Sequence, residues 1–287
     1  MAERLADIIA KMANVRQLEA VVTAMRGIAA SRAQQARGLL AGIEAYSDVV
    51  AQAMGQALSL LTDADSDPSA AGASRLGFIL FCAEQGFAGA FSERVLDAAK
   101  QGNKKGIEEA SIFVLGTRGA AIARERGVTC AWSAAMATQS GAVTAVANRT
   151  ADALYDAVAA GEMTKVDILF PSVVSGSGIE IIRRSLLPLD LTRFRRSSTN
   201  LPPLTTLSPD ALVERLAAEY VFAQLCDAAM HAFVAENEAR MMAMASAKTN
   251  IQEKLADLSR RERQLRQEEI TTEIIELAAG AQAIGGR

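Results

Sequence analysis

The chain has 287 residues, of which half are hydrophobic, and a formal net charge of −3. This length allows one or two domains with a real core, and the small net charge argues against a general nucleic-acid binder. No run of about 20 apolar residues is present, so no segment is expected to span a membrane. The N-terminus lacks the apolar core of a signal peptide, which predicts a cytosolic chain.

The cysteine and histidine content argues against two kinds of site. Cys82, Cys130 and Cys226 are odd in number and far apart, and none belongs to a Cys-x-x-Cys pair. We therefore expect free thiols in a reducing compartment. His231 is the only histidine, so we expect no metal site and interpret it as a packed or surface residue.

Residues 1–61 are predicted to form one long helix, because no proline precedes Pro68. Its apolar positions recur at steps of three and four, which is typical of a coiled-coil seam. The expected seam positions are Leu5, Ile8, Met12, Val15, Leu18, Val22, Met25, Ala29, Arg32, Ala36, Leu39 and Ile43. The short step from Val15 to Leu18 predicts a stammer that overwinds the supercoil. Four glycines, Gly27, Gly38, Gly42 and Gly55, weaken this helix, and we expect their small size to let a neighbour approach closely.

The middle of the chain, residues 75–190, alternates apolar runs with helical patterns. Small, acidic and turn-forming residues at about 62–75 predict a linker before it. The expected strands are Arg75–Cys82, Ile112–Leu115, Val166–Phe170 and a candidate fourth at Glu180–Leu189, and the expected helices are Ala90–Lys100, Ala120–Arg126 and Ser140–Ala160. This alternation predicts an α/β layer with a largely parallel sheet.

The same segment offers little chemistry. Gly86-Phe87-Ala88-Gly89 follows the first strand, where nucleotide folds bind phosphate, but its spacing is not Gly-x-Gly-x-x-Gly, so a tight turn is the better interpretation. Glu84 is a single acid at a strand end and makes no acid–base pair. No active site or cofactor site is predicted. After the sheet, Arg193, Arg195 and Arg196 indicate either a solvated loop or a contact with an acidic partner.

Residues 208–284 are predicted to form a second, longer helix, with Ser208 as the N-cap and Pro209 in the first turn. Asp210 to Ala279 contains neither glycine nor proline, and a helix of about 70 residues spans about 100 Å. Its expected seam positions are Met230, Val234, Asn237, Met241, Met244, Lys248, Ile251, Leu255, Leu258, Glu262 and Leu265. This 3.5-residue repeat predicts an antiparallel coiled coil with the N-terminal helix. A single amphipathic helix lying along a globular body is the alternative.

Several local sequences resemble one family. They are Ala24-Met25 with Ile28-Ala29-Ala30-Ser31-Arg32, the run Glu236 to Met244, the pattern Arg266-Gln267-x-x-Ile270-Thr271-x-Glu273-Ile274-x-Glu276-Leu277-x-x-Gly280-Ala281, Gly86-x-x-Gly89, and Leu186-Leu187-Pro188-Leu189. Together with the order helix, α/β layer, helix, they are similar to the γ subunit, or central stalk, of F-type ATP synthases. The resemblance covers nearly the whole chain, and its two terminal motifs are highly specific.

Four departures from the family pattern indicate a divergent branch, such as that of a second-copy ATPase. Ala20-Val21-Val22-Thr23 replaces a usual Lys-Ile-Thr-Lys, and Gly27 stands where methionine is common. Glu262-Arg263 replaces a Tyr-Asn pair, and Cys82-Ala83-Glu84-Gln85 lacks the usual aspartate before the glycine turn. These changes affect the expected contacts of the shaft and leave the expected architecture intact.

The resemblance implies an antiparallel coiled coil of the terminal helices with a central Rossmann-like α/β domain. It implies a non-catalytic rotor shaft that couples rotation of a membrane c-ring to the catalytic β subunits. The implied partners are the α, β and ε subunits and the c-ring, without nucleic acid, and with membrane contact only through partners. The implied location is the cytoplasmic face of a bacterial inner membrane, as a peripheral subunit.

The resemblance also implies site residues. Arg266 and Gln267 align with family residues that contact a β-subunit loop, although a solvated charged face over Arg260–Glu269 is the alternative. Met25 and Arg26 are expected at the antiparallel level of that loop. The apolar positions Ile270, Ile274, Leu277 and Ile284 are expected to occupy a low-friction sleeve at the top of the catalytic ring.

Two other functions remain open at this point. The chain could be a free-standing coiled-coil adaptor or chaperone that is active alone. It could also be a small-molecule enzyme that uses the α/β layer and dimerises through its helices.

Overall fold

The computed structural model describes residues 5–61, 75–101, 110–174, 176–194 and 204–285, the last of these with side chains to Ala279. The predicted linker and Arg195 and Arg196 lie outside the described residues, apart from Arg75 at the linker's end. The chain divides into two compact units. Met1–Ile28 and Met241–Arg287 form the first, here called the helix-pair unit, and Ala29–Arg240 form the second, the sheet unit.

Two long helices contribute to both units. Helix α1 spans Leu5–Leu58, and helix α5 spans Pro209–Gly285. Both lack interior proline, so the intrahelical hydrogen-bond ladder has no missing donor in either helix. The two predicted helices are therefore confirmed.

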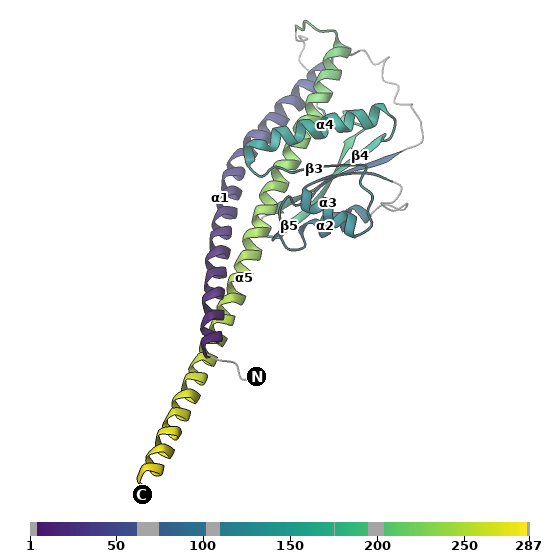
Figure 1. Ribbon diagram of the computed structural model, residues 1–287. Coiled ribbons are helices and arrows are strands. Elements are labelled where there is room, and N and C mark those ends of the chain that lie inside the picture. The colour runs from purple at the N-terminus through teal and green to yellow at the C-terminus, as the bar shows by residue number, and fades with distance from the viewer. Residues whose placement is uncertain (1–4, 62–74, 102–109, 175, 195–203, 286–287) are drawn as a thin grey trace. The chain divides into compact units, whose positions relative to one another are not determined.

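In the helix-pair unit, α1 and α5 run antiparallel (Figure 1). Near the start of α1, Ile8 and Met12 pack with Leu258, and further along α1 Val22 packs with Met244 and Ile251. Residue numbers thus rise on one helix as they fall on the other, which confirms the predicted antiparallel pairing.

The seam predicted on α5 is also confirmed. All its positions in this unit are buried or half-buried: Met241, Met244, Lys248, Ile251, Leu255, Leu258, Glu262 and Leu265. The predicted stammer on α1 is wrong. Leu18 is 52% exposed, and Glu19 occupies the seam instead, accepting a hydrogen bond of 3.1 Å from Gln252. The steps from Val15 to Glu19 and Val22 are four and three, so the supercoil repeat is regular here.

The sheet unit contains a five-stranded sheet of order β3-β2-β1-β4-β5. Its strands are β1 (Leu76–Phe81), β2 (Ser111–Leu115), β3 (Trp132–Ala134), β4 (Lys165–Val174) and β5 (Gly178–Leu187). Strands β1 to β4 pair in parallel, and β5 pairs antiparallel with β4. This confirms the α/β class and the candidate fourth strand. The short strand β3 was not predicted.

Helices cover both faces of this sheet (Figure 1). One face packs against α2 (Phe91–Lys100) and α3 (Thr117–Glu125) through Phe78, Leu80 and Val114. The other packs against α4 (Val143–Ala159) and the sheet-unit part of α5 through Ile79, Phe81 and Phe170. Because successive strand residues point to opposite faces, a continuous apolar run such as Phe78 to Phe81 fits a sheet covered on both sides.

The part of α5 inside the sheet unit is buried on almost every side from Val221 to Arg240. Alanines lie where neighbours are close, as at Ala228, Ala229 and Ala232. The polar seam residue Asn237 is satisfied within the helix, where its side-chain amide donates to the Phe233 carbonyl at 2.8 Å. A helix buried all round differs from the two-stranded seam expected from the sequence, and the sheet supplies the additional neighbour.

Two expectations for α1 in the sheet unit are wrong. Leu39 is 47% exposed, and the adjacent Leu40 packs against the core instead. Gly38 and Gly42 do not allow close approach either, because a Cβ at each would meet nothing within 4 Å. The same holds for Gly27 in the helix-pair unit.

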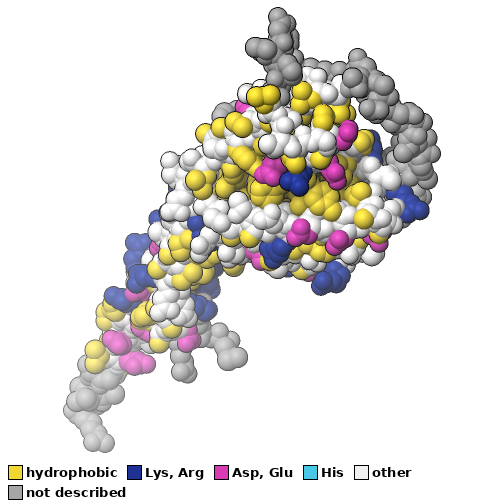
Figure 2. All heavy atoms as spheres, turned by 90° about the horizontal axis from the view of Figure 1, so that it is seen from above, with side chains coloured by type: hydrophobic (Ala, Val, Ile, Leu, Met, Phe, Trp, Pro, Cys, Tyr) yellow, Lys and Arg dark blue, Asp and Glu magenta, His cyan; other side chains and the backbone are white. Residues whose placement is uncertain are grey.

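None of the described helices holds an apolar stretch long enough for a bilayer crossing. On the face drawn in Figure 2, basic and acidic side chains occur side by side with hydrophobic ones. No single sign of charge dominates that face, in keeping with the net charge of −3.

Candidate interaction sites on the helix pair

The carboxyl ends of β1 and β2 are the place where an α/β fold of this kind would bind a nucleotide. Here two carboxylates of the chain itself occupy the backbone donors. Glu236 on α5 accepts from the N–H groups of Glu84 and Gln85 at 3.1 and 3.2 Å. Glu84 in turn accepts from the N–H of Thr117, at the start of α3, at 3.0 Å and from that of Met136 at 2.7 Å.

Arg240 completes this cluster. It forms an ion pair with Glu236 one turn away on α5, and it donates to the carbonyls of Gln85 and Gly86. The side chains of Glu236 and Arg240 are only 4% and 7% exposed. Since the donors that would hold a phosphate already bind carboxylates, the turn at Gly86-Phe87-Ala88-Gly89 serves to join the sheet to α5. The predicted tight turn is the correct interpretation.

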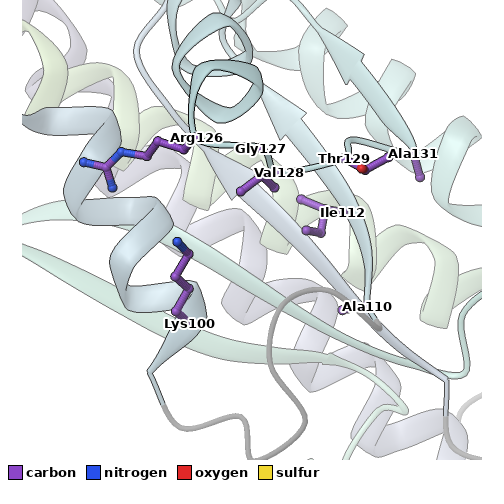
Figure 3. Close-up of a pocket in the computed structure, with 8 residues that line it drawn as sticks. All are labelled: Lys100, Ala110, Ile112, Arg126, Gly127, Val128, Thr129 and Ala131. Atoms are coloured by element: carbon purple, nitrogen blue, oxygen red, sulfur yellow. The ribbon is translucent and has the colours of Figure 1, made fainter.

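A cavity of about 270 Å³ lies at the other end of the sheet, beside the start of β2 (Figure 3). Lys100, Ile112 and Arg126 are among its lining residues, and Arg126 is paired with Asp97 at 2.7 Å. Ligand sites of open α/β sheets lie at the carboxyl ends of the strands, and this cavity lies at the amino end of β2. It therefore does not support an enzyme site.

His231 belongs to a polar network between α5 and the sheet, which agrees with its interpretation as a packed residue. Its Nδ1 lies 3.0 Å from Ser172 Oγ and its Nε2 lies 3.4 Å from Asp227. Arg184 on β5 also donates to Asp227, at 2.8 Å. Burial raises the pKa of the Asp227 carboxyl, but the hydrogen bonds from His231 and Arg184 outweigh it and hold that pKa below its ordinary value.

On the helix-pair unit, the predicted β-contact residues Arg266 and Gln267 are both exposed on α5. Arg266 donates to Glu262, one turn earlier, at 2.8 Å. The Arg266 guanidinium is thus available to a partner only in competition with this carboxylate. Exposed pairs of this kind contribute about 0–1 kcal/mol, so a better-placed partner carboxylate could displace Glu262.

The other predicted contact residues lie at a different level of the helix pair. Met25 is half-buried beside Val22 and Met244, and Arg26 is exposed. The contact of Glu19 with Gln252 fixes the register, so at about 1.5 Å per residue the level of Met25 is about 30 Å from that of Arg266. The expectation that the two pairs share one level is wrong, because α1 passes Arg266 only near its own first turn.

The predicted bearing residues are exposed on the same helix. Ile270, Ile274 and Leu277 are 51%, 60% and 74% exposed, and every described side chain from Arg266 to Ala279 is exposed. The backbone of Ile284 is helical, but its side chain lies outside the described part. Sequence reasoning found these residues through their motif. It included Glu236 and Arg240 in the resembling run Glu236 to Met244 but assigned them no role, and their i,i+4 spacing is the local signal of the pair that they form.

Comparisons with known proteins agree with these features. A family model described as ATP synthase matches residues 4–284. The ATP synthase gamma chain of Streptomyces avermitilis is 29% identical, over 96% of this chain and 94% of that protein. That of Symbiobacterium thermophilum is 23% identical over the whole of both chains. A chain from the Euglena gracilis mitochondrial ATP synthase, solved as an OSCP/F1/c-ring assembly, has a TM-score of 0.66 at 12% identity, covering 98% and 94% of the two chains.

Antiparallel terminal helices with an α/β unit between them in sequence define a central-stalk type of subunit. The chain belongs to the ATP synthase γ family. It is a non-catalytic subunit, and the carboxylates that fill the strand ends of its sheet are consistent with that role.

Proposed function

We propose that the chain is the central rotor shaft of a rotary ATP synthase and couples rotation of a membrane c-ring to conformational changes at catalytic β subunits. The observation that carries this proposal is the antiparallel helix pair, in which α5 continues past Leu265 as an exposed helix. A helix segment with no packing partner among the described residues of its own chain needs another chain to bury its apolar residues.

The proposed partners are the α and β subunits, the ε subunit and the c-ring, which agrees with the F1/c-ring assembly of the Euglena relative. In this scheme residues 1–61 and 208–284 form the shaft, and residues 75–190 form the foot that meets ε and the c-ring. The chain is peripheral and reaches the membrane through these partners. We propose the cytoplasmic face of a bacterial inner membrane as its location, which agrees with the bacterial sources of its curated relatives.

Torque transmission requires contacts that differ between conformations of β. A contact shifts a β subunit toward one conformation only by the difference in its free energy between the two. An asymmetric shaft presents different side chains to each of three β subunits, and rotation moves those differences from one site to the next. The chain supplies shape and stiffness, and no catalytic group of its own is needed.

Arg266 and Gln267 are the proposed contact with a β-subunit loop. An arginine can make a bidentate pair with a carboxylate, which is stronger than the single bond it now makes to Glu262. Met25 and Arg26 form a second, separate contact about 30 Å away along the pair. Ile270, Ile274, Leu277 and Ile284 form the bearing end.

The test is the double variant Arg266→Ala, Gln267→Ala in the reassembled complex. We expect a lower ratio of ATP-driven ion pumping to ATP hydrolysis, by about fivefold to tenfold if about 1–1.4 kcal/mol of contact is lost. Glu268→Ala, also exposed on α5, is the matched control and should leave the ratio unchanged. An unaltered ratio in the double variant contradicts the coupling role of the pair.

Glu262→Gln tests whether Arg266 acts on the partner directly, because it removes the carboxylate that pairs with Arg266 inside this chain. The ratio of pumping to hydrolysis should stay the same or rise, opposite to the effect of Arg266→Ala. A fall comparable to that of Arg266→Ala would mean that the Glu262–Arg266 pair itself is the functional unit.

The two other functions make different predictions. An enzyme that uses the sheet unit should bind nucleotide, whereas we expect no heat of binding when ATP is titrated into the full chain in a calorimeter. A free adaptor should purify alone, whereas we expect native pull-down to recover ATP synthase subunits.

A further inference from the structure

Alanines make up much of the buried surface of α5 in the sheet unit. Ala228, Ala229 and Ala232 are at most 2% exposed and belong to the core that joins α5 to the sheet. Helices interlock with their neighbours through ridges of side chains, and alanine gives only low ridges. Apolar contact is also non-directional. Packing on these alanines keeps α5 against the sheet but opposes rotation of the helix about its own axis only weakly.

Directional contacts join the same part of α5 to its neighbours. Arg184 on β5 donates from Nη1 to Gln224 Oε1 at 2.6 Å and to Asp227 Oδ2 at 2.8 Å. Gln224 in turn donates to Ser47 Oγ on α1 at 2.8 Å. The side chains of Arg184 and Asp227 are 28% and 9% exposed, so little solvent competes for this ion pair.

These contacts continue along one face of α5. His231 Nε2 lies 3.4 Å from Asp227, and His231 Nδ1 lies 3.0 Å from Ser172 Oγ on β4. Gln224, Asp227 and His231 are three and four residues apart, so they share a face. The residues joined in this way are here called the Arg184 network: Ser47, Ser172, Arg184, Gln224, Asp227 and His231. The network therefore connects α5 to α1, β4 and β5.

Glu236 contacts the sheet unit from the opposite side of α5. It follows Asp227 by nine residues, which at about 100° per residue places the two side chains about 180° apart around the helix. Glu236 accepts from the turn after β1, whereas Asp227 accepts from β5. Polar contacts on opposite sides of a helix oppose its rotation in either direction, because the two forces act as a couple.

Hydrogen-bond geometry makes these contacts sensitive to rotation of α5. Polar atoms of its side chains lie about 5 Å from the helix axis, so a rotation of about 20° moves them by about 2 Å. Because N–H···O bonds span about 2.7–3.2 Å, such a rotation breaks them. A buried ion pair that loses one partner strongly destabilises a protein. The folded sheet unit thus favours a single rotational setting of α5.

Building on the proposed function, we propose that Arg184 is a positioning residue for torque transmission. Through Gln224 and Asp227 it holds α5 at one rotational setting, together with Glu236 on the opposite side of the helix. When the foot turns, the sheet carries α5 with it instead of slipping around it. Helix α1 follows, because Gln224 is also bonded to Ser47.

Arg183, the neighbour of Arg184 on β5, supplies a matched comparison. It pairs with Asp167 at 2.7 Å, and its guanidinium lies 5.1 Å from the centre of the Phe78 ring. Arg184 has the same chemistry, since its guanidinium lies 4.9 Å from the centre of the Phe170 ring. Phe78 belongs to the sheet face covered by α2 and α3, so the Arg183 pair stabilises the unit without holding α5.

The test replaces each ion pair by apolar side chains, because such a replacement is often neutral or stabilising. The key variant is Arg184→Met with Asp227→Leu. The control is Arg183→Met with Asp167→Leu. Each chain is reassembled with the catalytic ring of the same ATP synthase, and a bead is attached to the foot through Glu162→Cys, an exposed position after α4. The angle of the bead is recorded while the ring is stalled without nucleotide.

We expect the key variant to widen the distribution of bead angles. If the contacts on the two sides of α5 contribute additively, loss of one side leaves about half of the resistance, and the variance of the angle rises by up to about twofold. The control should match the parent. Urea midpoints followed by Trp132 fluorescence should not fall in the key variant. A purely structural role of Arg184 would leave the bead angles as in the parent.

Two further variants keep the test decisive if the key variant does not fold. Asp227→Asn keeps the shape of the side chain and removes its charge, so it should widen the angles by a smaller amount. Arg184→Lys keeps a cationic donor at this position and should stay close to the parent. Parent-like angles in Asp227→Asn would contradict the proposal, as would equal widening by Arg184→Lys.

The outcomes separate the two proposals. If the parent chain does not assemble with the ring, or its bead does not turn when ATP is supplied, the proposed function fails. If the parent turns and the key variant has the same angular variance, only the role of Arg184 is refuted. Equal widening in the control also refutes it, because loss of any ion pair from the sheet would then have the same effect.

Discussion

The carboxylate of Glu236 on α5 accepts a hydrogen bond of 3.1 Å from the backbone N–H of Glu84 in the turn after β1. Its second oxygen accepts from Gln85 and from Arg240. A single side chain of the long helix thus holds the carboxyl end of the sheet, and the chain's own carboxylate lies where a nucleotide fold would bind phosphate. The turn that binds phosphate in nucleotide folds thus attaches the Rossmann-like sheet to the long helix α5 in this stalk subunit.

Loss of that carboxylate should destabilise the sheet unit strongly. Glu236→Leu leaves Arg240 buried without its partner, and breaking a buried ion pair costs about 3–5 kcal/mol. Urea unfolding followed by the fluorescence of Trp132, the only tryptophan, reports on this unit. Glu44→Leu, at an exposed position on α1, is the control and should leave the midpoint nearly unchanged. A midpoint for Glu236→Leu equal to that of the control would disprove the role of Glu236.

Two glycines in the sheet unit should respond in opposite directions to alanine. A Cβ at Gly119 in α3 would lie 2.1 Å from the Cβ of Cys82, and overpacking of this kind costs about 1–3 kcal/mol or more. A Cβ at Gly38 in α1 would meet nothing within 4 Å, so Gly38→Ala should stabilise by up to about 1 kcal/mol. Thermal unfolding of the two variants checks both signs. Equal shifts in one direction would contradict the packing described for Gly119.

The register of the helix pair can be tested by cross-linking. Glu19→Cys with Gln252→Cys should be joined by a short bifunctional thiol cross-linker, because the ends of the native side chains meet in a hydrogen bond of 3.1 Å. Met25→Cys with Gln267→Cys should not, because their levels differ by about 30 Å. Cys130, the half-buried native thiol, is first replaced by alanine. A cross-link in the second pair but not in the first would require a different register.

Asp227 should make the stability of the sheet unit depend on pH in the acid range. Burial raises its pKa, but hydrogen bonds from His231 and Arg184 bring the net pKa below the ordinary value. The ionised form is therefore favoured in the folded state, so its contribution is full above about pH 4, the unfolded pKa, and is lost as pH falls through the lower folded pKa. Asp227→Asn should cost about 1.5–3 kcal/mol at neutral pH.

Urea midpoints of the parent and of Asp227→Asn, measured from pH 7 down to pH 3, check this dependence. The difference between the urea midpoints of the parent and the variant should become smaller as the pH falls toward 3. Asp152→Asn, on the exposed face of α4, should shift neither the midpoint nor its pH dependence. A difference in urea midpoint that stays constant over the whole pH range would show that Asp227 acts through packing rather than through its charge.

The two long helices were predictable because their signal is repeated many times. Absence of proline and a 3.5-residue repeat over many turns leave few alternatives for α5, and all of its predicted seam positions in the helix-pair unit are buried or half-buried. On α1 the same reasoning failed at Leu18 and Leu39, because leucines also occur on a second, exposed face. A pattern of hydrophobic residues cannot by itself say which of two adjacent stripes meets the partner.

In the sheet, too, the strands with a strong sequence signal were predicted and the strand without one was missed. Buried strands such as Phe78–Phe81 give a continuous apolar run, whereas β3 has three residues at an edge and gives almost no signal. The residues of the candidate site were likewise predictable only in part. The motif located Arg266 and Ile270 on α5, but the levels of Met25 and Arg266 depend on the register of two segments more than 200 residues apart.

The sequence alone thus determined the two helices, the α/β class and the residues exposed at the end of α5, because each depends on local periodicity or on a contiguous motif. Only the tertiary structure decided that Glu236 caps the turn after β1, that Glu19 rather than Leu18 faces α5, and that Met25 lies far from Arg266. Those facts depend on which distant backbone atoms and side chains meet. Contacts between segments remote in sequence produce no periodic pattern in the sequence of either segment, so sequence periodicity cannot predict them.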